Sequence, residues 1–287
     1  MDLFAIGSNL PARVGIGKGG VKVGICCFIL AKNEEVNIAR CLTALRACGT
    51  HTVVLDSHSS DDTAEIARRF GAEVRTYDYT THVEALQYIC EQSTRPEDFV
   101  MVLDADMQVS PELVNEATEL LQSGKVDAVS APVLMYWEGK PLPYGSMYPP
   151  KPFMFRGGKH YFEAVGHGEQ LMAWVKVAVT KNTLIHNDLK PLGVYLDTQC
   201  RYCNNWLKRS AAGQSTVRDK LRKTPLILFA APLYSYILKL GFLSGRAGLG
   251  YALDRLIAEA IKYRQSLAMK VNPEVSPDCR AGRAACE

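Results

Sequence analysis

Short apolar runs alternate with amphipathic segments through the first half of the chain. A short apolar run indicates a buried strand, whereas apolar positions that recur every three or four residues indicate a helix. Strict alternation of the two predicts right-handed βαβ units in an α/β fold: a doubly wound, mostly parallel sheet with helices on both faces. The predicted strands are 21–30, 52–55, 74–77 and 99–104, and the predicted helices are 36–45, 64–70, 82–92 and 111–121.

The pattern changes twice more along the chain. Further apolar strands are predicted at 126–137 and 171–180, and from Gln199 the spacing is helical. We therefore expect an α/β domain with a C-terminal helical appendage. The predicted divisions are a flexible, Gly-rich arm over 1–20, the α/β domain over 21–198, the appendage over 199–270 and a disordered tail over 271–287.

Composition excludes several classes of protein. The chain of 287 residues has 33 basic and 30 acidic side chains, so its charge does not point to nucleic acid as a partner. Its nine cysteines are odd in number and irregularly spaced, which is typical of reduced thiols in a cytoplasmic protein. The first twenty residues do not have the pattern of a secretory signal, so we expect a cytoplasmic location.

Two acids follow the apolar run 99–103. In open α/β sheets, ligands bind beyond the carboxyl ends of the strands, where Asp104 and Asp106 would lie. Side chains at i and i+2 of a strand point the same way, so both carboxylates could face one cation. Carboxylate oxygens suit Mg²⁺ or Mn²⁺, although a pair of strand-end acids that cap the next helix is the simpler alternative.

Three segments in register resemble the family 2 glycosyltransferases. They are 29–35 (Ile-Leu-Ala-Lys-Asn-Glu-Glu), 53–63 (Val-Val-Leu-Asp-Ser-His-Ser-Ser-Asp-Asp-Thr) and 103–106 (Leu-Asp-Ala-Asp). The resemblance covers about 21–190, and the C-terminal part looks like bacterial members that build lipopolysaccharide core or other surface glycans. It implies a GT-A fold, a nucleotide-diphospho-sugar donor with UDP as the first expectation, a divalent cation (Mg or Mn), and inversion at the anomeric carbon.

The resemblance also implies roles for individual residues. Glu169 is the expected catalytic base and Asp188 competes with it. In the first loop, Asn33 is also the predicted N-cap of the next helix. The implied substrate-binding residues are Leu30, Lys32 and Glu34 at the nucleotide, Asp56 at the base, Asp104 at the ribose, and Lys190 or Arg201 at the leaving diphosphate. The implied metal ligands are Asp104, Asp106 and His186. Ser57 departs from the family, where a second acid is usual.

The appendage combines basic and apolar stretches. Residues 201–223 hold seven Lys or Arg against one acid, and the apolar stretch 225–243 follows, interrupted by Pro232 and Lys239. Such a combination predicts a helix that lies in the interface of an anionic membrane, at the inner face of the cell membrane, with a glycan or glycolipid acceptor nearby. A hairpin packed on the α/β domain, a homodimer contact and a true span are the alternatives.

Two other functions compete with sugar transfer. A sugar-phosphate nucleotidylyltransferase needs a Gly-rich basic loop after the first strand, but residues 31–35 are acidic and contain no glycine. A non-catalytic nucleotide-sugar-binding protein would not need Asp104, Asp106 and a placed base. The Pro-rich segment 141–152, with Tyr144 and Tyr148, is either a stiff surface loop or a wall of the acceptor site.

Overall fold

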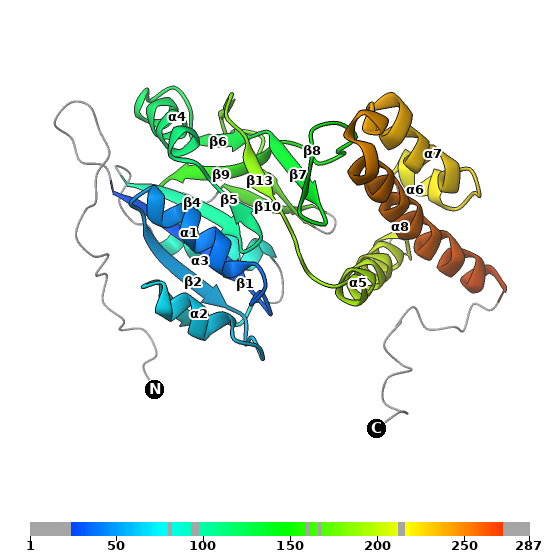
Figure 1. Ribbon diagram of the computed structural model, residues 1–287, viewed down its shortest axis with the longest axis horizontal. Coiled ribbons are helices and arrows are strands. Elements are labelled where there is room, and N and C mark those ends of the chain that lie inside the picture. Colours follow the sequence, from blue (N-terminus) through cyan, green and yellow to red (C-terminus); the bar gives the residue numbers. More distant parts are fainter. Residues whose placement is uncertain are drawn as a thin grey trace. The chain divides into compact units, whose positions relative to one another are not determined.

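The computed structural model describes residues 24–79, 82–92, 98–158, 161–165, 168–211 and 216–271 (Figure 1). The chain forms two compact units. The first unit comprises Met1–Val133, Pro149–Ala164 and Gly168–Asn187, and the second comprises Leu134–Tyr148, Val165–His167 and Asp188–Glu287. The division therefore falls at Asn187, before the boundary expected at 198, and the second unit also takes in 141–148 of the Pro-rich segment.

A seven-stranded sheet forms the centre of the first unit. Its strand order is β12-β6-β9-β4-β1-β2-β3. The strands are β1 (Ile25–Ala31), β2 (His51–Asp56), β3 (Glu73–Thr76), β4 (Phe99–Asp104), β6 (Ala128–Ala131), β9 (Lys151–Arg156) and β12 (Val177–Val179). All neighbouring pairs are parallel except those of β9, which runs antiparallel to both β4 and β6. The predicted doubly wound, mostly parallel sheet is confirmed.

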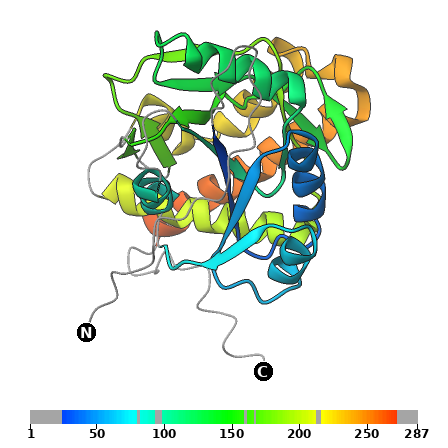
Figure 2. The same ribbon diagram turned by 90° about the vertical axis from the view of Figure 1, so that its left-hand side faces the viewer.

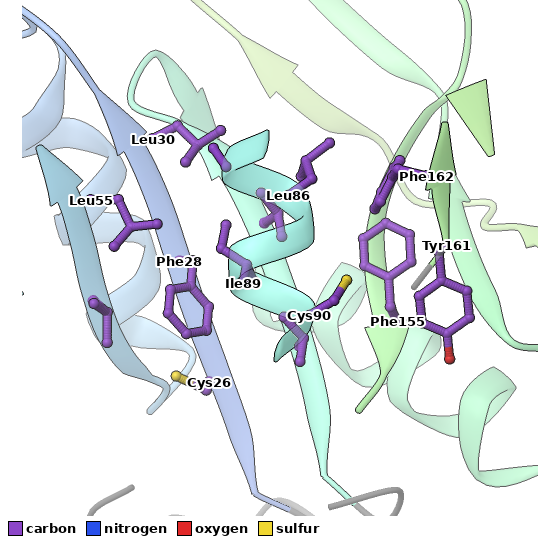
Figure 3. Packing of buried hydrophobic residues seen from close by; sticks show 14 of the residues in the cluster. Cys26, Phe28, Leu30, Leu55, Leu86, Ile89, Cys90, Phe155, Tyr161 and Phe162 are labelled. Carbon is purple, nitrogen blue, oxygen red and sulfur yellow. The ribbon is translucent and has the colours of Figure 1, made fainter. Parts of the chain in front are cut away.

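Helices cover both faces of this sheet (Figure 2). On one face, α3 packs against alternate residues of β1, and Phe28 and Leu30 share a buried cluster with Leu86 and Ile89 (Figure 3). On the other face, Cys27 lies near Cys41 of α1. This two-sided burial explains the continuous apolar run of β1. The helices of the first unit are α1 (Ile38–Ala47), α2 (Thr63–Arg69), α3 (His82–Gln92) and α4 (Pro111–Gln122).

Two smaller sheets, one of four strands and one of two, lie outside the main sheet. The predicted strand 126–137 is interrupted at Pro132, so that its second half is a separate strand, β7 (Val133–Trp137). β7 forms a hairpin with β8 (Lys140–Leu142) through Glu138 and Gly139, both at positive φ, as a two-residue hairpin turn requires. The remaining strands are β5 (Met107–Gln108), which pairs with β13 (Leu184–His186), and β10 (Phe162–Val165), which pairs with β11 (Gly168–Leu171).

The second unit is mainly helical. It contains α5 (Leu192–Ala211), α6 (Val217–Arg222), α7 (Ile227–Leu233), the π-helix η1 (Tyr234–Leu238), the 3₁₀-helix η2 (Gly241–Ser244) and α8 (Gly245–Val271). The predicted helical character of the appendage is therefore correct, although the first helix begins at Leu192 rather than Gln199. The hairpin β7–β8 packs on α8: Trp137 donates a hydrogen bond to Asp254 (2.9 Å), and Gly250 leaves room for the Trp137 ring.

A buried polar network holds α6 in the second unit. The indole N–H of Trp206 donates to the carboxylate of Asp219 (2.8 Å), which also caps α6 through Thr216. Arg222 then bridges Asp219 (2.9 Å) and Glu259 (2.9 Å). Each buried charge therefore has a hydrogen-bonded partner, which is the condition under which charges are tolerated in a protein interior.

Candidate active site

Three acids converge where the central parallel strands end. Asp104 is the last residue of β4 and pairs with Leu30, and Asp56 is the last residue of β2 and pairs with Ala31. Burial, followed by the negative charges of Asp104, Asp56 and Glu34, raises the pKa of Tyr79 to about 12. Tyr79 therefore lies within electrostatic range of three carboxylates that the sequence predicted for donor binding, at the edge where α/β sheets bind ligands.

Asp104 lies between two groups that can carry positive charge. Its carboxylate forms an ion pair with the ammonium group of Lys151, and its Oδ1 lies 3.4 Å from Nε2 of His82. Burial by itself would raise the pKa of Asp104, but Lys151 and His82 outweigh burial and hold that pKa well below its usual range. Asp104 is therefore a carboxylate in the ionised form, with about a third of its side chain exposed (31 %).

Asp106 belongs to a different local structure from Asp104. β4 ends at Asp104, and Ala105 and Asp106 form a turn before β5. The strand alternation on which the shared direction of the two carboxylates was predicted therefore does not extend to Asp106. Instead, Oδ2 of Asp106 lies 3.4 Å from Nε2 of His186, whose strand β13 pairs with β5.

The segment that carries His186 is fixed on both sides. The backbone N–H of Asn187 donates to the carbonyl of Asp106 (3.0 Å). From α1, the guanidinium of Arg40 donates to the carbonyl of Asn187 (3.0 Å) and to the side chain of Asn37 (2.6 Å). The imidazole of His186 and the carboxylate of Asp106 are thus held together by backbone hydrogen bonds as well as by their own contact.

The Asp106–His186 pair suits a divalent cation. A carboxylate oxygen and an imidazole nitrogen that bind one ion, each at about 2.1 Å, lie about 3.0–3.5 Å apart, in agreement with the 3.4 Å between Oδ2 and Nε2. Among the described residues, no three His, Cys, Asp or Glu side chains form a group that could hold a metal. Of the three predicted ligands, Asp106 and His186 are therefore together, whereas Asp104 is engaged by Lys151.

Hydrogen bonds join the loops that follow β1 and β2. Asn33, at positive φ, donates its backbone N–H to Ser59 (2.9 Å) and accepts from the N–H of Ser60 (2.8 Å). Asn33 therefore holds the second loop and does not cap α1, which begins at Ile38, so the predicted N-cap is wrong. The side chain of Asp56 in turn accepts hydrogen bonds from the N–H and the hydroxyl of Ser59 (3.1 and 2.5 Å).

The other predicted donor-binding residues have different surroundings. The side chain of Leu30 is buried in the core beside α3, so only its backbone can face a ligand (Figure 3). Lys32 is exposed, and the backbone N–H of Glu34 donates to Thr63 (2.7 Å).

The predicted base and diphosphate residues lie elsewhere. Glu169 is part of β11, but its side chain lies outside the described residues. Asp188, Lys190 and Arg201 belong to the second unit. Within that unit, Asp188 accepts a hydrogen bond from the N–H of Lys190 (3.0 Å), and Arg201 on α5 lies over the ring of Tyr202.

Three residues of this site were missed from the sequence: Lys151, His82 and Tyr79. Lys151 lies in the Pro-rich segment and is the first residue of β9, and nothing in that segment indicated that a strand returns to the centre of the sheet. The register of β9 against β4 pairs Phe99 with Arg156 and Met101 with Met154, and its continuation sets Lys151 opposite Asp104. An antiparallel strand inserted in a parallel sheet has no local signature, so only the topology could identify this lysine.

The fold and the site define an α/β protein with carboxylates beyond the carboxyl ends of its parallel strands, the edge at which such sheets bind ligands. Residues 26–184 match the family described as glycosyl transferase family 2, and the chain belongs to that family. Uncharacterized glycosyltransferases of Rickettsia are similar in sequence. One from Rickettsia typhi is 33% identical over 103 residues (36% of this chain, 35% of the relative), and one from Rickettsia prowazekii is 30% identical over 122 residues (42% and 41%). The matched stretch thus spans well under half of the length of these relatives.

Two solved structures illustrate the structural comparison. One is S. aureus TarS, with 13% identity, 88% of this chain and 92% of that chain covered, and a TM-score of 0.46. The other is glucosyl-3-phosphoglycerate synthase from Mycobacterium tuberculosis, described in complex with Mn²⁺, uridine-diphosphate and glucosyl-3-phosphoglycerate, with 17% identity, 68% and 82% covered, and a TM-score of 0.46.

Proposed function

We propose that this chain is an inverting glycosyltransferase that moves a sugar from a nucleotide-diphospho-sugar to the hydroxyl of an acceptor. The observation that carries the proposal is the pairing at the strand ends, where Asp104 contacts Lys151 and His82 while Asp106 contacts His186. A site with two carboxylates, each in contact with basic side chains of its own, supports the binding of a cation and of a diphosphate side by side.

In this proposal, a Mg²⁺ or Mn²⁺ ion would be held by Asp106 and His186, while Asp104 remains in its ion pair with Lys151. When bound, such an ion stabilises the negative charge that develops on the departing nucleoside diphosphate. Lys151 is largely buried, with 11 % of its side chain exposed. Its ammonium group would orient the Asp104 carboxylate and lower the negative charge that the donor diphosphate meets.

We assign the donor contacts to the acids at the strand ends and to the loop after β1. Asp56 would accept hydrogen bonds from the base and Asp104 from the ribose. The backbone of Leu30 and the loop with Lys32 and Glu34 would contact the nucleotide. A uridine base is our first expectation, because it is the usual choice in the family that the sequence resembles. Lys190 or Arg201 would contact the leaving diphosphate.

Inversion requires one base at the acceptor. The acceptor hydroxyl attacks the anomeric carbon as the bond from that carbon to the diphosphate oxygen breaks, and the bonding electron pair leaves with the diphosphate. The proton of the hydroxyl passes to a carboxylate, for which Glu169 and Asp188 are the two candidates. We propose a glycan or glycolipid acceptor of the kind used in the synthesis of lipopolysaccharide or other surface glycans.

A donor panel tests this function. Nucleotide-sugars with uridine, guanosine, cytidine and thymidine bases are added with Mn²⁺, and the melting temperature and slow donor hydrolysis are measured. We expect one donor class to raise the melting temperature and to be hydrolysed, and the Asp106→Ala variant to lose hydrolysis while it keeps the fold. Absence of any response to the whole panel would contradict the proposal.

A further inference from the structure

The helical segment from Leu226 to Leu238 has two apolar faces, only one of which is covered by the protein. Ile227, Ala231 and Ser235 recur every four residues and are buried. Ser235 donates a hydrogen bond to the carbonyl of Gly145 (2.8 Å) within the second unit. This face accounts for the packing of α7 and η1 on the rest of the unit, including α8.

The opposite face is apolar and exposed. Leu226, Phe229, Leu233 and Ile237 recur at helical spacing and are 50 to 65 % exposed, and Leu238 is 71 % exposed. An open apolar groove is lined by Ala230, Leu233, Tyr234, Ile237 and Leu238. A helix that is apolar on all sides is normally buried, so a face of this kind marks a site where something covers it.

The exposed surface continues beyond the bend of the chain. Phe242 and Leu243 of η2 and Leu249 and Leu253 of α8 are all about half exposed. The bend itself follows Leu240, which is at positive φ, between η1 and η2. We call this surface, from Leu226 to Leu253, the apolar corner (α7 and α8 in Figure 1).

The charge around the apolar corner has one sign. Between Asp219 and Asp254 the sequence contains five basic side chains and no acidic one. Arg222 is committed to its buried ion pairs, while Lys220, Lys223, Lys239 and Arg246 are exposed. The ammonium group of Lys239 lies 6.0 Å from the centre of the Tyr234 ring.

We propose that the apolar corner docks on an anionic lipid bilayer, with its leucines and phenylalanines in the interface and its basic side chains at the headgroups. Exposed apolar side chains beside a uniformly basic rim complement a surface that is apolar inside and negative outside. A second copy of the chain fits this surface less well, because the basic side chains around the apolar corner of each copy would repel one another. The cytoplasmic leaflet, which carries anionic lipid, is the expected location.

Among the described residues, no single helix is long and apolar enough to cross a membrane. Two consecutive helical stretches, Ile227–Leu238 and Gly241–Val271, are together long and apolar enough by length and composition, and they are bent by 69° relative to each other.

Vesicle sedimentation of the full chain tests the inference. Vesicles of phosphatidylcholine alone and of phosphatidylcholine with phosphatidylglycerol are used, without nucleotide-sugar, so the result does not depend on the proposed sugar transfer. We expect binding to the anionic vesicles that falls about tenfold in the Phe229→Ser/Leu238→Ser and Lys239→Glu/Arg246→Glu variants. The control Val177→Ser/Val179→Ser removes two exposed apolar side chains from β12 in the first unit and should bind as the parent chain does.

Three results would overturn the inference. They are failure of the parent chain to sediment with anionic vesicles, equal binding by Phe229→Ser/Leu238→Ser, and a dimer in lipid-free light scattering that this variant converts to a monomer. The melting temperature of each variant, measured in parallel, confirms that the variants are folded.

Discussion

Lys151 stands opposite Asp104 where the antiparallel strand β9 continues its register along β4, and the two side chains form an ion pair. β9 is the strand that breaks the parallel order of the sheet. The topology therefore brings the ammonium group of Lys151 to the carboxylate of Asp104 at the end of β4. The acid that the sequence predicts for donor binding is therefore held ionised and oriented by a residue far along the chain.

Replacing Lys151 should therefore impair the site while leaving the fold intact. We expect Lys151→Met to lower kcat/KM for donor hydrolysis by about 10- to 100-fold, since it leaves Asp104 without its ionic partner. Lys151→Arg should recover part of this loss, and Lys176→Met, at an exposed position, should have no effect. Because the two residues touch, the losses in Lys151→Met and Asp104→Asn should combine less than additively in the double variant. Full additivity would mean that the pair does not act as a unit.

His186 should contribute to cation binding. We expect His186→Ala to weaken Mn²⁺ affinity by about tenfold or more, because it removes the imidazole that lies 3.4 Å from Asp106. Titration of Mn²⁺ by electron paramagnetic resonance measures this directly. His51→Ala is the control, because His51 lies at the opposite end of β2 and contacts Glu73. Equal affinity in His186→Ala and the parent chain would remove His186 from the site.

Asp219 should stabilise the second unit in a pH-dependent way. Burial raises the pKa of Asp219, but hydrogen bonds from Thr216 and Arg222 outweigh burial and lower it to about 2, from an ordinary value of 3.8. A carboxylate with a lowered pKa contributes stability above about pH 4 that is lost as the pH falls towards 2. Asp219→Asn should therefore cost about 3–5 kcal/mol of unfolding free energy at pH 7, and less at pH 2–3.

The Asp219 prediction is checked by urea unfolding of the variant and the parent chain across that pH range. Glu119→Gln, an exposed carboxylate on α4, should follow the parent chain throughout. A difference between Asp219→Asn and the parent chain that stays constant from pH 7 to pH 2 would show that ionisation is not the cause.

Lys262 should have the opposite effect on stability. Burial lowers the pKa of this lysine of α8 from 10.5 to about 8. The unfolded chain therefore binds the proton more tightly than the folded chain. The charged form of Lys262 lowers the free energy of unfolding at pH 7, and this destabilisation decreases as the pH rises from 8 to 10.5. We expect Lys262→Met to raise the melting temperature by a few degrees at pH 7 and by less at pH 10. Lys270→Met, exposed on the same helix, is the control. A larger gain at pH 10 would contradict the account.

The local features of the fold could be predicted from the sequence because they depend on neighbouring residues. The buried strand that ends at Asp104 and the helix at His82–Gln92 follow from hydrophobic spacing alone, and both match the structure. The helix after Ser110 is fixed by a Ser that accepts the N–H of Leu113 and by Pro111 in the first turn.

The rest of the site depends on contacts between distant segments. The spacing of Asp104 and Asp106 predicted a shared direction, but β4 ends at Asp104 and the turn places Asp106 beside His186. Nothing near Asn33 in the sequence indicates that its side chain binds Ser60 rather than capping a helix. Lys151 and His82 reach Asp104 from β9 and α3, so they could be found only once the order of the strands was known.

The central claim is that Asp106 belongs to a site for a cation and a nucleoside diphosphate. Isothermal titration of UDP into the parent chain and into Asp106→Asn, each with and without Mn²⁺, tests it most directly. We predict that Mn²⁺ strengthens UDP binding to the parent chain by at least about tenfold and has little effect on the variant, because the variant lacks the charged oxygen ligand. Equal binding of UDP by both proteins, with the same response to Mn²⁺, would contradict the account.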